Sequence, residues 1–211
     1  MIDVYAFSTP NSLKVPVALE EMELEYKLHS VNIRQGGQKT PNFMALNPNA
    51  KVPVLVDSEA EGGPLTLSES AAILVYLAEK TGKLLPNSVH GRARVMEQLF
   101  FHASGIGPAF GNSGFFQKFA PEPIPLAIDR FKSEGRRTSA LLDDILSRQE
   151  FVAGDEFSIA DVAHFGWMWR RSFAGIETED LVNLNRWYDA LAARPAFQIA
   201  IARTMALAEV S

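Results

Sequence analysis

The sequence predicts a small mixed α/β module followed by an all-helical domain. Strand-like segments and helix-type apolar spacing alternate up to about residue 80, whereas long helical patterns follow from residue 90 onward. The segment KLLPNSVHG, residues 83–91, is rich in turn formers and separates these two parts. We therefore expect one domain at residues 1–82 and a second at residues 89–211.

The first module is expected to run strand, helix, strand and then helix, strand, strand, helix. IDVYAF, residues 2–7, is rich in β-formers, and Ser12 is the expected N-cap of the helix that follows, with Pro16 near its first turn. Apolar runs and helical spacing predict the other elements: strands at 25–33, 51–57 and 65–67, a short helix at 41–45, and a helix capped by Ser68 that stops at Gly82.

The second half of the chain reads as helices separated by Gly- and Pro-containing breaks. SIAD, Ser158 to Asp161, has the pattern of a capping box, in which a hydroxyl and a carboxylate satisfy the first N–H groups of a helix, so we expect a structural role for it. The helical patterns cover residues 91–104, 123–149, 159–172 and 181–206.

Composition excludes several classes of function. The 211 residues include 20 basic and 25 acidic side chains, and no basic cluster exceeds a pair, which argues against nucleic acid as a partner. No signal-peptide pattern or long apolar stretch is present, so we expect a cytoplasmic protein without a membrane partner. The absence of cysteine excludes a cysteine nucleophile, and the four histidines lack metal-ligand spacing, so we expect no metal.

The start of the helix after residue 67 carries groups that complement an amino-acid zwitterion. Free backbone N–H groups and the hydroxyl of Ser70 can bind a carboxylate, while Glu69 can hold an ammonium group. Spacing alone favours plain capping of the helix over such a site.

Two turns carry further candidate chemistry. Thr9 and Asn11 offer a hydroxyl, an amide and backbone N–H groups at a helix start, surroundings that lower the pKa of a thiol supplied by a ligand. Val52 precedes Pro53 at a strand entry; a trans bond is favoured statistically, but a cis bond would free the backbone of Val52 to pair with an extended peptide. From these residues alone, ordinary turns remain the favoured interpretation.

These pieces, in this order, resemble a cytosolic glutathione transferase over nearly the whole chain. The resemblance implies the glutathione transferase fold: a thioredoxin-like N-terminal domain (βαβ-αββα) followed by an all-α C-terminal domain. SIAD matches the family's capping-box motif, and LNRWYDALAARPAF looks like its late helix. Within the family, the segments STPNSLKV, RQGGQ, NPNAKVPVLVD, LSESAAILVYLAEKTG and IPLAIDRF look most like the bacterial Nu-class proteins, which reduce disulfide bonds with glutathione.

The resemblance implies a role for each matching residue. Thr9 and Asn11 would stabilise the thiolate of glutathione and so count as the catalytic residues. A cis Val52-Pro53 bond would present the backbone of Val52 to the cysteinyl part. The other implied contacts are Glu69 and Ser70 with the γ-glutamyl end, Gln38 and Lys51 near the glycyl carboxylate, and Arg130 with bound glutathione, of which each site could take two molecules. The resemblance also implies a homodimer that acts on small disulfides or electrophiles.

The chain departs from the subgroup where a second glutathione or the substrate would enter. Leu126 stands where a tyrosine is typical, Asn112 replaces a glutamine, and SGFF, with Phe115 and Phe116, replaces a more polar segment. Glutathione-dependent disulfide reduction is the leading hypothesis. Conjugation of glutathione to small electrophiles and a non-catalytic binding scaffold with the transferase fold are the alternatives.

Overall fold

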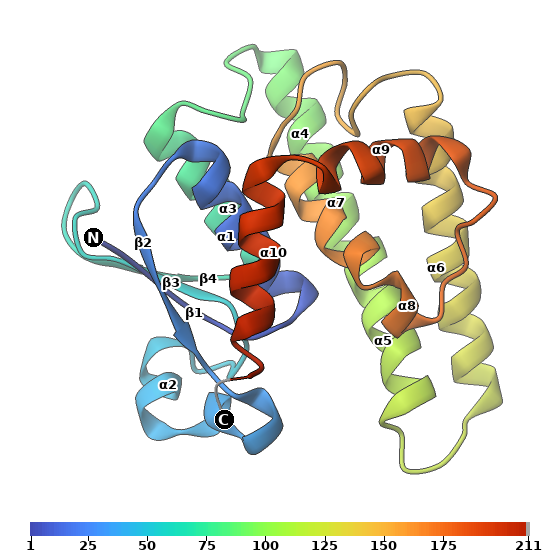
Figure 1. Cartoon of the computed structure of the whole chain (residues 1–211), viewed down its shortest axis with the longest axis horizontal. Coiled ribbons are helices and arrows are strands. Elements are labelled where there is room, and N and C mark those ends of the chain that lie inside the picture. Colours follow the sequence, from blue (N-terminus) through green and yellow to red (C-terminus); the bar gives the residue numbers. More distant parts are fainter. Residues whose placement is uncertain (210–211) are drawn as a thin grey trace. The chain divides into compact units, whose positions relative to one another are not determined.

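The computed structural model describes residues 1–209, which form two compact units. The first comprises Met1–Lys83 together with the residues from Arg194 onward, and the second is Leu84–Ala193. The expected thioredoxin-like α/β module followed by helices is present (Figure 1). The units differ from the predicted domains, 1–82 and 89–211, in the assignment of the last helix, which belongs to the first unit.

A four-stranded mixed sheet with the order β2-β1-β3-β4 forms the centre of the first unit. β1 pairs in parallel with β2 and antiparallel with β3, and Val4 lies opposite Leu28 on one side and Leu55 on the other. β4 then pairs antiparallel with β3. The strands are β1 (Ile2–Ala6), β2 (Tyr26–Ser30), β3 (Val54–Asp57) and β4 (Leu65–Ser68).

Helices cover both faces of this sheet. Phe43 packs against Val31 and Val54 in a buried cluster on one face of the sheet. The core on the other face contains Val4 and the helices α1 and α3, which pack against each other. Pro16 lies inside α1 instead of in its first turn, because the helix begins earlier than the sequence predicts. The helices are α1 (Pro10–Met22), α2 (Pro41–Leu46) and α3 (Ser70–Thr81), and two short 3-10 turns, η1 (Ile33–Gln35) and η2 (Gly37–Lys39), precede α2.

The last helix, α10 (Pro195–Ala206), packs against α1 (Figure 1). The guanidinium of Arg194 forms two hydrogen bonds with the carboxylate of Glu21, at 2.6 and 2.7 Å. Arg203 donates to Glu20 at 2.9 Å and lies over the ring of Tyr26. Paired charges and buried apolar contacts therefore attach the C-terminal helix to the first unit.

The second unit is helical throughout, with α7 as its most buried helix. Asp161 lies in the first turn of α7, where the predicted capping box with Ser158 is present. The same buried carboxylate accepts hydrogen bonds from the indole of Trp187 and the backbone N–H of Val152, both at 2.9 Å. The helices are α4 (Val89–Phe101), α5 (Gly107–Lys118), α6 (Pro125–Leu146), α7 (Ile159–Trp169), α8 (Arg171–Ala174) and α9 (Val182–Ala192).

A π-helical turn, η3 (His102–Ile106), continues α4 directly into α5, so the predicted break at residue 104 is no interruption of the helical path. Among residues 1–209, no helix combines the length and apolar character that crossing a membrane requires.

Candidate functional site

Most of the predicted site residues of the first unit line one cavity of about 140 Å³. Asn47 also lines it and was not predicted as a site residue. The predicted residues that it brings together come from the start of α1, the loop before β3 and the start of α3: Asn11, Lys51, Val52, Pro53, Glu69 and Ser70.

Thr9, and not Ser12, is the N-cap of α1. The backbone of Thr9 is extended, and its hydroxyl oxygen accepts from the backbone N–H of Ser12 at 3.1 Å. The Thr9 hydroxyl also donates to Ser12 Oγ at 2.9 Å. Ser8, Thr9 and Ser12 all satisfy the same sequence rule, and only the backbone conformation selects Thr9. In this arrangement Thr9 caps the helix, and donation to a ligand requires its hydroxyl to rotate.

Asn11 lies one residue after the Pro10 start of α1, so its backbone is in the first turn. Its side-chain oxygen accepts a hydrogen bond from Lys14 Nζ at 2.8 Å. Lys14 Nζ also donates to Ser70 Oγ, at 3.3 Å, and thereby joins the starts of α1 and α3.

Lys14 is a site residue that the sequence reasoning missed. Its side chain is fully buried, with 0% exposure. Burial lowers the pKa of Lys14 well below its ordinary value, although the nearby negative charge of Glu69 opposes that shift. The spacing of three residues from Asn11 was the available signal, because residues at positions i and i+3 share one face of a helix.

The start of α3 also differs from the sequence prediction. Ser68 ends β4, and the N-cap is Glu69, whose φ of 67° lies in the left-handed region that non-glycine residues seldom adopt. No side chain among residues 1–209 caps this helix start. Backbone strain of this kind is concentrated at functional sites, and here it coincides with the cavity.

The loop before β3 completes the cavity wall. The Val52-Pro53 peptide bond is cis, as the resemblance implies and as residue statistics alone did not predict. Val52 lies two residues before Val54, the first residue of β3, so the backbone of Val52 is outside the hydrogen-bond ladder of the sheet. The buried Asn47 amide donates to the carbonyl of Lys51 at 2.8 Å and thus supports this loop. An Asn-Pro-Asn turn signal at residues 47–49 could have identified it.

Three predicted site residues, Thr9, Gln38 and Arg130, are not among the residues that line the cavity. Gln38 lies in η2, and its buried side-chain oxygen has no hydrogen-bond partner within residues 1–209. A buried acceptor without a partner is costly, so the Gln38 amide is suited to a ligand or a water molecule. Arg130 lies in α6 of the second unit and is exposed.

The cavity combines groups for both charges of a zwitterion. The N-termini of α1 and α3, which reach it through Asn11 and Ser70, present N–H groups and positive dipole ends that favour an anion. Glu69 supplies a carboxylate suited to an ammonium group. The arrangement can therefore bind an amino-acid moiety and stabilise a further anion beside Asn11.

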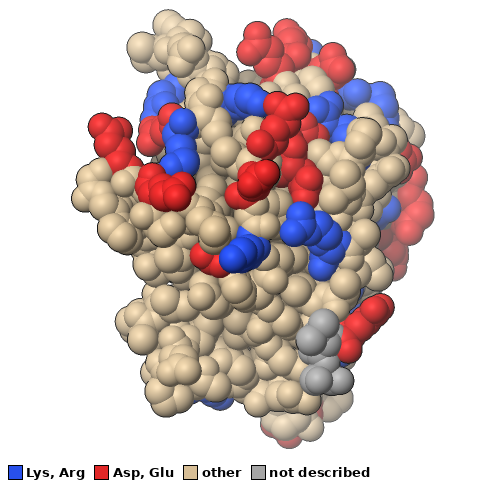
Figure 2. Space-filling view, turned by 60° about the vertical axis from the view of Figure 1, so that its left-hand side comes forward, with Lys and Arg blue, Asp and Glu red and all other residues tan. Residues whose placement is uncertain are grey.

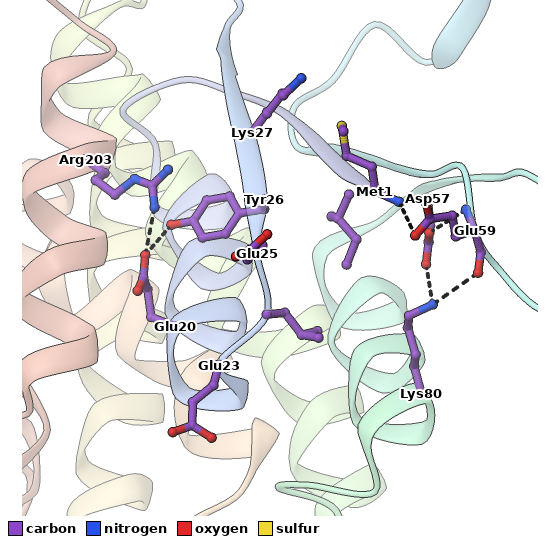
Figure 3. Close-up of a pocket in the computed structure, with 12 residues that line it drawn as sticks. Met1, Glu20, Glu23, Glu25, Tyr26, Lys27, Asp57, Glu59, Lys80 and Arg203 are labelled. Atoms are coloured by element: carbon purple, nitrogen blue, oxygen red, sulfur yellow. Dashed lines mark hydrogen bonds and ion pairs between the residues drawn. The ribbon is translucent and has the colours of Figure 1, made fainter.

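A much larger cavity in the first unit, of about 840 Å³, contains none of the predicted site residues (Figure 3). Its walls carry ion pairs between Lys80 and Asp57 and between Arg203 and Glu20, at 2.8 and 2.9 Å. Acidic and basic groups are also intermixed on the face in Figure 2. Because most of its charged groups already have partners, size alone does not make this cavity the better candidate.

The aromatic segment of the second unit is partly exposed. Phe119 is 66% and Phe115 is 44% exposed, and both follow Asn112, whose amide donates to the carbonyl of Pro108 within α5. Phe116 stacks on Phe131. Leu126 is 82% exposed at the start of α6. We name the exposed side chains of Phe115, Phe119 and Leu126 the apolar patch.

Family models match both units. The glutathione S-transferase N-terminal domain matches residues 9–80, and the glutathione S-transferase C-terminal domain matches residues 129–195. This protein therefore belongs to the glutathione S-transferase family. In residues 1–209, no group of three or more histidine or acidic side chains is arranged to hold a metal ion.

The relatives carry more specific names. The chain is 40% identical over 200 residues to disulfide-bond oxidoreductase YfcG of Escherichia coli (strain K12). This match covers 93% of this chain and 92% of that protein. It is 35% identical to disulfide-bond oxidoreductase YghU of the same organism, over 92% of this chain and 72% of that protein. A glutathione transferase family member from Pseudomonas fluorescens pf-5, solved with two glutathione molecules bound, matches with a TM-score of 0.89 and 35% identity, over 95% of this chain and 92% of that one.

Proposed function

We propose that this protein is a glutathione-dependent disulfide-bond reductase of the Nu class. The observation that carries the proposal is the cavity at which the starts of α1 and α3 combine anion-binding groups with the carboxylate of Glu69. The names of the two Escherichia coli relatives support the reaction, and the two glutathione molecules in the Pseudomonas fluorescens protein support two per site. In this proposal the enzyme acts in the cytoplasm as a homodimer.

The chain's residues fit the parts of glutathione. Glu69 binds the ammonium group and Ser70 the carboxylate of the γ-glutamyl end, because carboxylate and helix-start groups complement that zwitterion. The free backbone of Val52 pairs with the cysteinyl part, in the way that an added strand pairs with a sheet edge. The unpartnered amide oxygen of Gln38 accepts from the peptide, and Lys51 attracts the glycyl carboxylate.

Arg130 is proposed as a further contact with bound glutathione. It is an exposed, permanently charged side chain of the second unit, suited to a carboxylate. It acts within its own subunit or across the proposed dimer.

Catalysis rests on thiolate stabilisation by the turn at the start of α1. Asn11 donates from its amide, Thr9 donates after its hydroxyl rotates from Ser12, and the helix N-terminus adds its dipole. Neither side chain is a base at neutral pH, so removing one donor slows turnover without abolishing it. Bound glutathione supplies the attacking thiolate, and the net reaction converts one disulfide and two glutathione molecules into two thiols and glutathione disulfide.

The apolar patch favours a second candidate function, conjugation of glutathione to an apolar electrophile. Phe115 and Phe119 expose aromatic surface that an aryl substrate can contact, whereas a polar disulfide gains little from it. Both reactions use the same stabilised thiolate.

The test compares the two reactions on one purified sample. Reduction of a small model disulfide is measured through glutathione disulfide formation, and an aryl halide reports conjugation. Fast reduction, weak conjugation and slower reduction in both Thr9→Ala and Asn11→Ala variants support the proposal. Dominant conjugation favours the second candidate. Binding of glutathione without either reaction favours a non-catalytic scaffold, and failure to bind contradicts the residue assignments.

A further inference from the structure

Lys14 is fully buried at the point where the two helix starts meet. A lysine is almost never fully buried without partners, because removing an amine from water costs free energy. Two of its hydrogen-bond partners, Asn11 at 2.8 Å and Ser70 at 3.3 Å, line the cavity. The sequence separation of 56 residues between Lys14 and Ser70 makes the second contact a product of the tertiary fold.

We propose that Lys14 is a positioning residue that orients Asn11 and Ser70 so that both present hydrogen-bond donors to the ligand. The inference rests on the proposed function, since the ligand at this cavity is taken to be glutathione. Lys14 is not proposed to touch glutathione itself.

For Asn11, the donor Lys14 selects one of two amide orientations. The side-chain oxygen of Asn11 faces Nζ, so the amide nitrogen is the group that remains for the cavity. An amide nitrogen is a donor only, which suits a thiolate. The reversed amide would present an oxygen, and an oxygen would repel the same sulfur.

For Ser70, the same amine uses the acceptor side of the hydroxyl. Ser70 Oγ accepts from Lys14, so its own proton is available for an anion that enters the cavity. One buried amine therefore prepares both the sulfur end and the γ-glutamyl end of the site.

The mechanism does not require Lys14 to be charged. Burial lowers the pKa of Lys14 and the negative charge of Glu69 opposes the shift, but the two hydrogen bonds need only two N–H groups. A neutral amine has both. Positioning can therefore persist over a range in which the amine titrates.

The experiment is a double-mutant cycle with Lys14→Met, Asn11→Ala and the double variant. Methionine keeps most of the buried volume of lysine and removes its donors. The readouts are the thiol pKa of bound reduced glutathione, from the ultraviolet absorbance of the thiolate, and kcat and KM for disulfide reduction. Val17→Ala, which truncates another buried residue of α1, is the matched control for lost stability.

We expect Lys14→Met to lower kcat about tenfold and to raise the thiol pKa of bound glutathione, because a misoriented donor stabilises the thiolate less. Adding Lys14→Met to Asn11→Ala should produce no further change in that thiol pKa, since the amide through which Lys14 acts is already gone. The effect of Lys14→Met on KM, which acts through Ser70, should persist in the double variant. Val17→Ala should lower stability and leave the thiol pKa unchanged.

A chemical rescue covers the case in which Lys14→Met fails to fold. The chain has no cysteine, so Lys14→Cys creates a single thiol. Alkylation of the denatured variant with 2-bromoethylamine, followed by refolding, restores an amine at the length of lysine. Recovery of the low thiol pKa supports the inference.

The inference is overturned if folded Lys14→Met binds glutathione with unchanged thiol pKa, kcat and KM, or if its thiol pKa effect adds fully to that of Asn11→Ala. It is also overturned if the refolded, aminoethylated protein binds glutathione without a lowered thiol pKa. A wild-type protein that lowers the thiol pKa without reducing disulfides contradicts the proposed reaction alone, because the cycle in thiol pKa still tests Lys14. A wild-type protein that binds no glutathione contradicts both.

Discussion

Helices α7 and α3 begin in opposite ways. At α7, Ser158 and Asp161 form a complete capping box, and the buried carboxylate also binds the indole of Trp187. At α3, no side chain among residues 1–209 caps the helix, and its N-cap residue, Glu69, adopts a positive φ next to the cavity. A helix start completed by its own side chains contributes stability, whereas one left open at a cavity can bind a ligand.

Removing Asp161 from the capping box of α7 should have the largest effect on stability. Asp161→Ala removes the acceptor of the buried N–H groups of Val152, Ser158 and Trp187. Each unsatisfied buried donor costs about 1–3 kcal/mol, so the free energy of unfolding should fall by about 3 kcal/mol or more. Urea denaturation measures this loss. Asp155→Ala, at an exposed acid in the loop before α7, should change stability by less than about 0.5 kcal/mol.

Asp161, in the capping box of α7, should also make the stability of the protein depend on pH. Burial raises the pKa of Asp161 to about 6, against the hydrogen bonds from Val152, Trp187 and Ser158 that lower it. A carboxyl whose pKa is higher in the folded state stabilises the fold at acid pH, and this contribution is lost as pH rises through about 6.

Relative to Asp161→Asn, which does not titrate, the wild-type protein should lose about 2 kcal/mol between pH 4 and pH 7. Urea denaturation at several pH values measures that difference. Parallel pH profiles for the two proteins would contradict the assignment to Asp161.

A change at the uncapped start of α3 should weaken the binding of glutathione and hardly change stability. Glu69→Gln removes the charge that is proposed to hold the ammonium group, and a charged hydrogen bond contributes about 1.5–3 kcal/mol. The KM for glutathione should therefore rise about tenfold or more, while the urea midpoint stays nearly constant because Glu69 is exposed. Glu61→Gln, at another exposed glutamate of the first unit, is the control and should leave KM unchanged. Equal KM values for both variants would place the ammonium elsewhere.

A change in the apolar patch should also have only a small effect on stability. Phe119→Ser removes a side chain that is 66% exposed and contacts Phe173 at a ring-centroid distance of 5.9 Å. The free energy of unfolding should change by about 1 kcal/mol or less. The KM for an aryl halide should rise more than the KM for a small polar disulfide, as steady-state kinetics would detect. Met44→Ser, at an exposed apolar residue of α2, should change neither KM value.

Local rules predicted the types of element well and their ends less well. The strands at residues 2–7 and 65–67 and the capping box at Ser158 lie where the sequence indicates them. The caps at Ser12 and Ser68 were wrong by three residues and one residue, because several neighbouring polar residues satisfy the same rule and only backbone conformation selects among them.

Lys14 was missed for a different reason. Its helical spacing from Asn11 is evident in the sequence, but a lysine at such a position is ordinarily exposed. Only the packing of α1 against α3 buries it and supplies Ser70 as a second partner.

The sequence by itself determined the mixed α/β module, the helical segments, the capping box and the residue types that suit a zwitterion and a thiolate, because these depend on periodicity and neighbouring residues. The tertiary structure decided that α10 packs on α1, that Glu69 adopts a positive φ, and that the starts of α1 and α3 meet at one cavity. The physical reason is the distance along the chain over which each effect acts. Local preferences act over about one helical turn, whereas contacts between distant segments depend on how the whole core packs.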